Sequence, residues 1–177
     1  FDINGNSIPI TRNMGKLYKV DINKQVTVIE DDLGIPNTFV WSPDNSKFYF
    51  TDTLTGTIKS YDFNLQTGTL TNKQNFINID RGLPDGSTID TDGCLWNCRW
   101  GGSCIVRFTP DGKIDQFIEM PVQNITNCVF GGSDMKTLFI TTASNEDDGR
   151  TDMGGNLFAI NLQYQGIEDH KSKIQFN

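Results

Sequence analysis

The sequence predicts an all-β fold of the β-propeller type, and three observations favour it. A glycine followed by residues that alternate between apolar and polar occurs four times, and such alternation is typical of a strand. The four glycines, at positions 15, 56, 102 and 155, are 41, 46 and 53 residues apart, and a period of about 40–50 residues indicates propeller blades. No window of eleven or more residues has a period of 3.6, so few helices are expected.

Three kinds of strand recur along the chain in the same order. The glycine-led strands are expected at residues 15–21, 56–62, 102–108 and 155–161. A second kind is expected at 35–41, 83–89 and 125–130, and a third kind follows a tight turn, at 47–52, 94–98 and 137–141. One of these turns, Asp90-Thr91-Asp92-Gly93, lacks the spacing and the final glutamate of a calcium-binding loop, so we interpret it as a hairpin turn.

The length of the chain sets the number of blades. At about 45 residues per blade, 177 residues hold about four blades, of which the first and the last look incomplete. Propellers seldom close with fewer than four full blades, and an open arc would leave unpaired strand edges. We therefore predict one β-propeller domain over residues 1–177 that is part of a larger ring or is completed by another chain.

Composition excludes several classes of function. The net charge of −7, without clustered Lys or Arg, disfavours nucleic acid as a partner, and no apolar run is long enough to span a membrane. With His170 as the only histidine, a His-based zinc site or a Ser-His-Asp triad is not expected, and a metal held by oxygen ligands would be a hard cation. No signal peptide is visible after Phe1, so the cytoplasm is the default location. The four cysteines lack C-x-x-C spacing and are expected to be reduced, mostly buried thiols.

Several segments together resemble a known family. They are residues 37–44, 48–53, 84–96, 126–132 and 138–143, of which the Pro-Asp-Gly…Asp…Gly-x-Leu-Trp pattern in 84–96 is the most specific. The sequence resembles the family that contains regucalcin (senescence marker protein), gluconolactonase and luciferin-regenerating enzyme. The resemblance implies a six-bladed propeller, of which this chain would be the C-terminal portion.

The resemblance also implies a site. Members of the family hold one divalent cation in the central channel and hydrolyse sugar lactones or related esters. Asn37 and Asp85 match two of their metal ligands, whereas a Glu, a further Asn and a substrate-binding Arg would lie before Phe1. Ca²⁺ is the preferred ion, and Mg²⁺, Mn²⁺ and Zn²⁺ stay open. Asp85 would also act as the catalytic general base, and Asn127, one blade further on, would line the channel as a substrate-binding residue.

Other interpretations stay open at this stage. Asp85 and Asn127 are also explained as turn residues, and Thr38 departs from the Asn-Gly pair usual in the family, because threonine resists a positive φ. A non-catalytic calcium-binding or protein-interaction propeller module is the alternative function. The 177-residue chain alone is expected to have weak or no lactonase activity, since half of the implied metal ligands are outside it. The sequence leaves open which lactone is the substrate and what the oligomeric state is.

Overall fold

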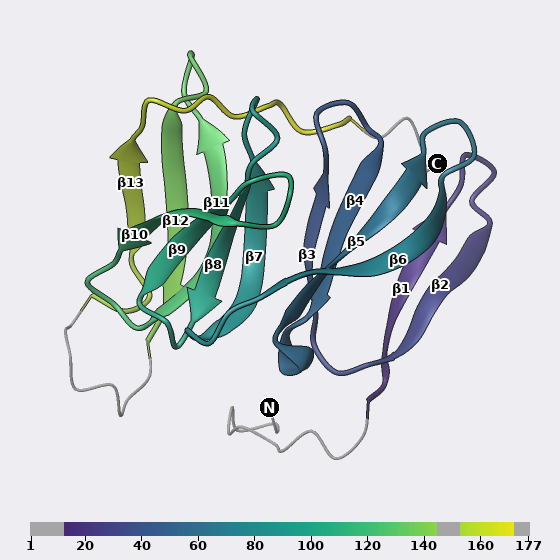
Figure 1. The fold of residues 1–177 in the computed structure, drawn as a ribbon, viewed down its shortest axis with the longest axis horizontal. Coiled ribbons are helices and arrows are strands. Elements are labelled where there is room, and N and C mark those ends of the chain that lie inside the picture. The colour runs from purple at the N-terminus through teal and green to yellow at the C-terminus, as the bar shows by residue number, and fades with distance from the viewer. Residues whose placement is uncertain (1–12, 145–152, 172–177) are drawn as a thin grey trace.

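The structure is a computed structural model that describes residues 13–144 and 153–171, and these residues form four antiparallel sheets (Figure 1). The first sheet pairs β1 (Gly15–Val20) with β2 (Val26–Leu33). The second contains β3 (Pro36–Trp41), β4 (Lys47–Asp52), β5 (Thr57–Asn64) and β6 (Thr69–Asn78). The third contains β7 (Leu83–Ile89), β8 (Leu95–Trp100), β9 (Cys104–Phe108) and β10 (Ile114–Glu119). The fourth contains β11 (Asn124–Gly131), β12 (Thr137–Ala143) and β13 (Leu157–Asn161).

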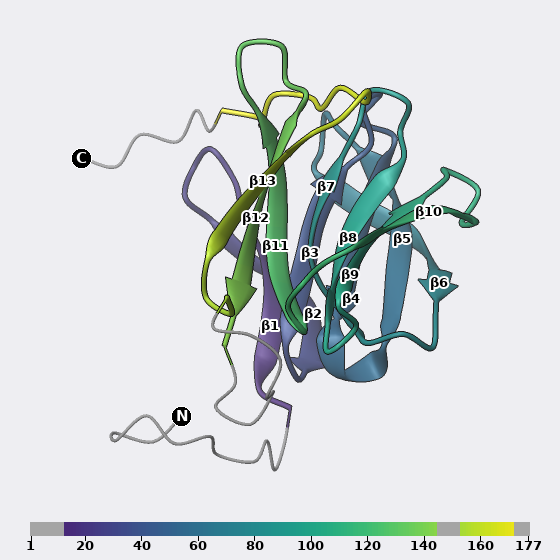
Figure 2. The same cartoon turned by 90° about the vertical axis from the view of Figure 1, so that its left-hand side faces the viewer.

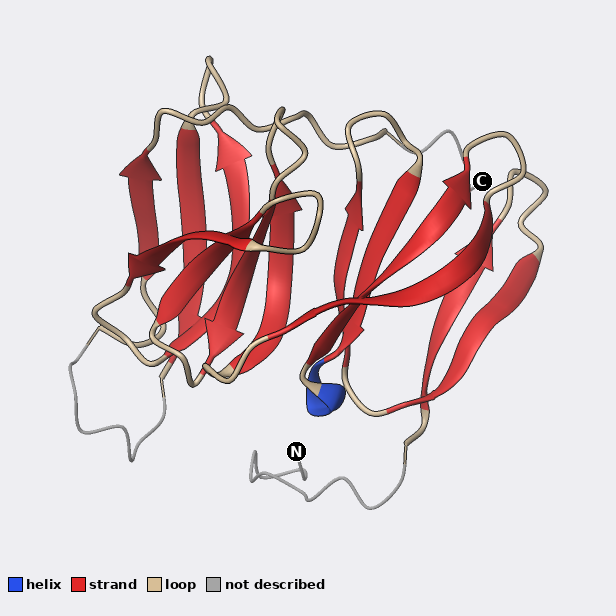
Figure 3. Ribbon diagram, viewed as in Figure 1, coloured by secondary structure: helices blue, strands red, loops and turns tan. Residues whose placement is uncertain are grey.

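The sheets are arranged as the blades of a propeller, which confirms the predicted fold class. Strands that follow one another in the chain are neighbours in each sheet. The first strands of three successive sheets, β3, β7 and β11, lie side by side, whereas β6 and β10 lie at the outer edges (Figures 1 and 2). Figure 3 shows that the described part of the chain contains a single helical turn, the 3₁₀ helix η1 (Thr53–Thr55). None of the described residues forms a helix long and apolar enough to cross a membrane.

The inner and middle strands match the strands expected from the sequence, but the outer ones do not. No strand was expected at β2, β6 or β10. Most side chains of β6 are exposed, so this strand lacks the apolar alternation on which the prediction relies. Cys94 was expected to begin the strand at 94–98 but lies in the turn before β8. All four cysteines are free and buried, as predicted.

The core consists of apolar layers between neighbouring sheets. Leu95 of β8 packs with residues of the β3–β6 sheet, whereas Trp96 and Cys98 of the same strand pack with the β11–β13 sheet. Because successive side chains of a strand point to opposite faces, a sheet with neighbours on both sides buries every residue of its middle strand. This explains why β8 is buried along its length except for Trp100, which is half-buried.

The turn at residues 90–93 is a hairpin turn between β7 and β8, as predicted, and hydrogen bonds to Asp90 stabilise it. The Asp90 carboxylate accepts hydrogen bonds from the backbone of Asp92 and Cys94 at 3.0 and 2.9 Å, and from Trp96 Nε1 at 2.9 Å. Arg107 of β9 donates to the same carboxylate at 2.8 Å. The segment after β13 crosses the ends of the sheets at this point (yellow in Figure 1), and its Tyr164 ring lies 4.0 Å from the Arg107 guanidinium.

Candidate functional site

The side chains of Asn37 and Asp85 meet between two neighbouring inner strands. Asn37 is the second residue of β3 and Asp85 the third of β7. Asn37 Nδ2 donates a hydrogen bond to Asp85 Oδ1, and it lies 3.4 Å from Thr53 Oγ1 of the adjoining helical turn. Both side chains are half-buried. The structure thus brings together the two residues that the sequence proposed as metal ligands.

A β-bulge at the same place in each inner strand explains why polar side chains gather here. The pairing register shifts between Asn37 and Phe39 in β3, between Pro84 and Ser87 in β7, and between Ile125 and Asn127 in β11. A bulge leaves an extra residue unpaired and re-aims the side chains around it. Three equivalent bulges therefore place their polar residues at one end of the inner strands.

Asn127 belongs to this group by its position. A Cβ atom on Gly86 would overlap Asn127 Oδ1 and would lie 2.7 Å from the carbonyl oxygen of Thr126, so glycine is what permits β7 and β11 to approach this closely. Asn127 itself is exposed, and its Oδ1 accepts a hydrogen bond from the Cys128 amide at 2.9 Å. The third residue proposed from the sequence therefore lies beside the Asp85–Gly86 bulge.

Thr38 adopts the backbone conformation that threonine resists. Its φ is +52°, in the left-handed region, where a β-branched residue is strained. Its buried hydroxyl donates to the carbonyl oxygen of Asp85 at 2.6 Å and lies 3.0 Å from Ser87 Oγ. The left-handed conformation expected of the usual glycine is retained, and the threonine hydroxyl adds a link between two sheets.

Substitution of Thr38 separates these two effects. Thr38→Ala loses the hydroxyl but keeps a Cβ at positive φ, so it is expected to lower the free energy of unfolding by about 1–2 kcal/mol. Thr38→Gly loses the same hydroxyl but relieves the backbone strain, so it is expected to be the more stable of the two variants. Urea denaturation of both variants measures the difference. A glycine variant less stable than the alanine variant would contradict the assignment of strain.

Asp85 is a half-buried carboxyl group that has no cationic partner among the residues the structure describes. Burial raises its pKa above the ordinary value, and the hydrogen bonds from Asn37 and from the Gly86 backbone offset only part of this effect. No ion pair with Asp85 is found in residues 13–144 and 153–171. The same residues contain no group of three or more His, Cys, Asp or Glu side chains suited to a metal. The two side chains that meet at this site are one amide and one carboxylate.

Sequence reasoning missed the polar residues behind the bulge. Asn97 and Arg99 of β8 are fully buried and connect to the Asp85 backbone through hydrogen bonds. No role was predicted for Asn97, and for Arg99 a place at the channel mouth was only a minority interpretation of the sequence. The available signal was the presence of two polar residues at alternate positions of a strand whose other residues are apolar or aromatic.

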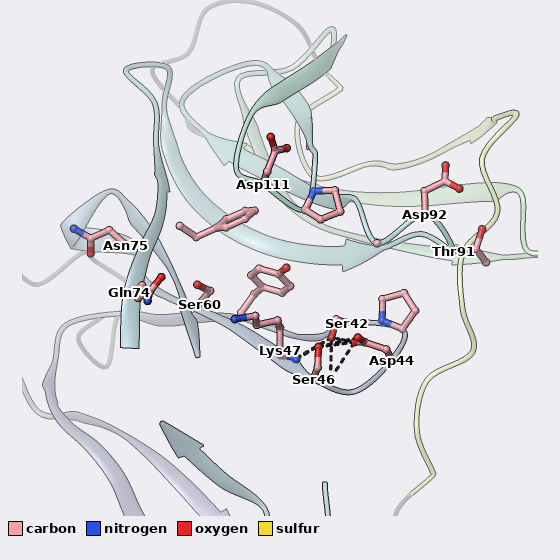
Figure 4. A pocket seen from close by; sticks show the side chains of 15 residues that line it. Ser42, Asp44, Ser46, Lys47, Ser60, Gln74, Asn75, Thr91, Asp92 and Asp111 are labelled. Carbon is pink, nitrogen blue, oxygen red and sulfur yellow. Dashed lines mark hydrogen bonds between the residues drawn. The ribbon is translucent and has the colours of Figure 1, made fainter. Parts of the chain in front are cut away.

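A cavity of about 590 Å³ lies elsewhere, at the opposite ends of β3 and β7 (Figure 4). Its lining includes three aspartates and none of Asn37, Asp85 and Asn127. Each aspartate is already engaged: Asp44 by Ser42 and Ser46, Asp92 by Arg107, and Asp111 by Lys113. The hydrogen bonds that hold Asp44 are drawn in Figure 4. This cavity therefore offers no free carboxylate for a cation.

Comparison with known proteins identifies the family. Residues 3–144 match the family described as the SMP-30/Gluconolactonase/LRE-like region. The chain belongs to this family. The match confirms the resemblance found in the sequence.

Members of the SMP-30/gluconolactonase family share both sequence and fold with this chain. It is 32% identical to pentonolactonase XacC of Haloferax volcanii over an alignment of 171 residues that covers 91% of this chain and 59% of that protein. The solved luciferin-regenerating enzyme has a TM-score of 0.81 and 26% identity over 88% of this chain and 54% of its own. Regucalcin from Agrobacterium tumefaciens, described as a calcium-binding protein, has a TM-score of 0.82 and 29% identity over 89% and 56%. The chain spans little more than half the length of these relatives.

Proposed function

We propose that this protein is a lactone hydrolase that opens sugar lactones, with Asn37 and Asp85 among the ligands of a divalent cation. The observation that carries the proposal is the contact between the Asn37 amide and the half-buried Asp85 carboxyl group at the inner strands of two neighbouring sheets. The similarity to a protein named pentonolactonase supports the lactone as the substrate class.

The chemistry of the two side chains fits a hard cation. Burial raises the pKa of Asp85 because it removes water from the charged carboxylate, and a bound cation would provide a balancing positive charge. Asn37 now directs Nδ2 at Asp85, so its amide would turn over to present the oxygen instead. Carboxylate and amide oxygens are typical Ca²⁺ ligands, and the similarity to a calcium-binding regucalcin supports this ion over Mg²⁺, Mn²⁺ and Zn²⁺. When bound, a divalent cation supplies polarisation of the lactone carbonyl.

The residues of the chain supply the other steps. Asp85 accepts a proton from the water that attacks the lactone carbonyl, and it returns this proton to the ring oxygen as the ring C–O bond breaks, which gives a hydroxy acid. The exposed amide of Asn127 offers a donor and an acceptor to the hydroxyl groups of a sugar.

Replacement of Asn37 tests the cation site. In the full-length protein, Asn37→Ala is expected to weaken Ca²⁺ binding by about 10–100-fold, which corresponds to about 1.4–2.8 kcal/mol. Calorimetric titration measures the affinity, and acid release from a pentonolactone or gluconolactone measures turnover, with and without a chelator. Asn75→Ala, on an exposed outer strand, is the matched control. Unchanged Ca²⁺ affinity in Asn37→Ala would refute the assignment of this ligand.

The same experiment distinguishes the lactone hydrolase from the alternative function. A non-catalytic calcium-binding module would bind Ca²⁺ through Asn37 and Asp85 but would not hydrolyse any lactone. The description of a similar solved protein as calcium-binding favours keeping this alternative. Ca²⁺ binding that is lost in Asn37→Ala, together with no lactone turnover in the wild type, would select the module over the enzyme.

A further inference from the structure

Two polar residues, Asn97 and Arg99, lie inside an apolar layer between two sheets. Both belong to β8 and project from the face that also carries Leu95, which packs against Val40 and Ile89. Their exposed fractions are 0% and 1%. Buried polar groups cost stability unless hydrogen bonds satisfy them, so the partners of these side chains indicate their purpose.

Arg99 is held entirely by neutral acceptors. Its Nε donates to the carbonyl oxygen of Arg81 at 2.9 Å, and Nη2 donates to those of Gly82 and Ile79 at 2.5 and 3.3 Å. Its Nη1 donates to Asn97 Oδ1 at 2.9 Å. Burial lowers the pKa of Arg99 to about 10, which leaves the guanidinium charged at neutral pH. In the described part of the chain no carboxylate pairs with it.

Arg99 thereby decides which way the Asn97 amide faces. A guanidinium has donors and no acceptor, so only the oxygen of the amide can face it. The nitrogen is then directed at the opposite side, where Asn97 Nδ2 donates to Ser87 Oγ at 2.9 Å and to the carbonyl oxygens of Asp85 and Gly86 at 3.3 and 3.4 Å.

The hydrogen bonds from Asn97 reach the part of β7 that is not paired with β8. Asp85 and Gly86 lie within the bulge, where the pairing of β7 with β8 is interrupted. Thr38 Oγ1, from the neighbouring sheet, donates to the same Asp85 carbonyl oxygen at 2.6 Å. Side chains from two sheets therefore replace the missing ladder at the residue whose carboxyl group meets Asn37.

We infer that Arg99 and Asn97 are positioning residues that hold the Asp85 bulge in the geometry needed for cation binding and water activation. The inference rests on the proposed function of Asp85, and it assigns to the hydrogen-bond chain from Arg99 through Asn97 the task of aiming the carboxyl group. Residues that orient metal ligands in this way commonly affect the affinity for the metal by about 10–100-fold.

Two substitutions of Asn97 test the inference and keep the fold. Asn97→Asp retains an acceptor for Arg99, with added charge attraction, and removes the donor to Asp85 and Gly86. Asn97→Leu removes the same donor without adding a charge and suits the apolar layer. Asp92→Asn is the control, because Asp92 contacts Arg107 at the far end of β7. Thermal unfolding verifies the fold, Ca²⁺ titration measures affinity, and amide hydrogen exchange at Gly86 and Ser87 measures how firmly the bulge is held.

We expect the Asn97 variants to lose the geometry of the site while they keep the fold. Both Asn97 variants should unfold cooperatively and bind Ca²⁺ about 10–100-fold more weakly, whereas Asp92→Asn should match the wild type. In both Asn97 variants the backbone amides of Gly86 and Ser87 should exchange their hydrogens faster than in the wild type, because a loosened bulge admits water. If folded Asn97 variants retain wild-type Ca²⁺ affinity and wild-type amide exchange at Gly86 and Ser87, the inference is wrong. If the wild type binds no Ca²⁺, the proposed function fails, and amide exchange at Gly86 and Ser87 still decides whether Asn97 holds the bulge.

Discussion

Asp85→Asn is expected to remove nearly all lactone turnover and, at the same time, to stabilise the fold at neutral pH. The amide cannot accept the proton of the attacking water, and general-base catalysis contributes about 10²–10⁴-fold to a rate. It also lacks the charge that binds a cation. The oxygen of an asparagine still accepts the hydrogen bond from Asn37, so the local structure is retained. Turnover of a sugar lactone by the full-length variant measures the loss.

The stability gain follows from the direction of the pKa shift. Burial raises the pKa of folded Asp85 above the value of about 3.9 expected for the unfolded chain. The stability that this carboxyl contributes is therefore complete below about pH 3.9 and is lost as the pH rises through the folded pKa. The neutral amide of the variant carries no such penalty, so Asp85→Asn should unfold at a higher temperature than the wild type at pH 7 without metal. A lower unfolding temperature at pH 7 would contradict this account.

Asp44 provides a control in which the expected change in unfolding temperature has the opposite sign. Hydrogen bonds from Ser42 and Ser46 lower its pKa to about 2. Its contribution to stability is present above about pH 3.9 and is lost as the pH falls toward 2. Asp44→Asn should therefore lower the unfolding temperature at pH 7, where Asp85→Asn raises it, and the same thermal scans measure both.

Arg107→Met is expected to cause the largest loss of stability. Arg107 and Asp90 form a 2.8 Å ion pair in which the side chains are 6% and 1% exposed. Removing one partner of such a pair leaves an uncompensated charge in the interior and typically costs about 3–5 kcal/mol. The guanidinium also packs on the Tyr164 ring, which links the C-terminal segment to the third sheet. Urea denaturation at pH 7 measures the change in the free energy of unfolding.

Lys113→Met supplies the comparison for an exposed pair. Lys113 and Asp111 are 78% and 58% exposed, and water and salt screen such a surface ion pair, so that it contributes little to stability. The loss for Lys113→Met should therefore be several times smaller than the loss for Arg107→Met. Equal losses would mean that burial does not set the strength of the Arg107–Asp90 interaction.

The predicted and the missed strands differ in how many faces they bury. β8 lies between two sheets, so its apolar residues on both faces and the preceding turn were visible in the sequence. β6 and β10 are outer strands whose residues are mostly exposed, and they follow the sheet through backbone pairing with β5 and β9. Backbone hydrogen bonds form whatever the side chains are, so an outer strand needs no alternation of apolar and polar residues and is hard to predict from the sequence.

The sequence by itself determined the propeller class and the order of its blades, because repeated spacing places equivalent strands in successive sheets. The candidate roles of Asn37, Asp85 and Asn127 came from the resemblance to the family. Only the tertiary structure decided that Asn37 and Asp85 meet beside two β-bulges, that Thr38 accepts a positive φ, and that Arg99 orients Asn97 behind Asp85. Periodicity records which face of a strand is buried. It does not record hydrogen bonds between side chains and the backbone of a neighbouring sheet, which depend on how closely the sheets pack.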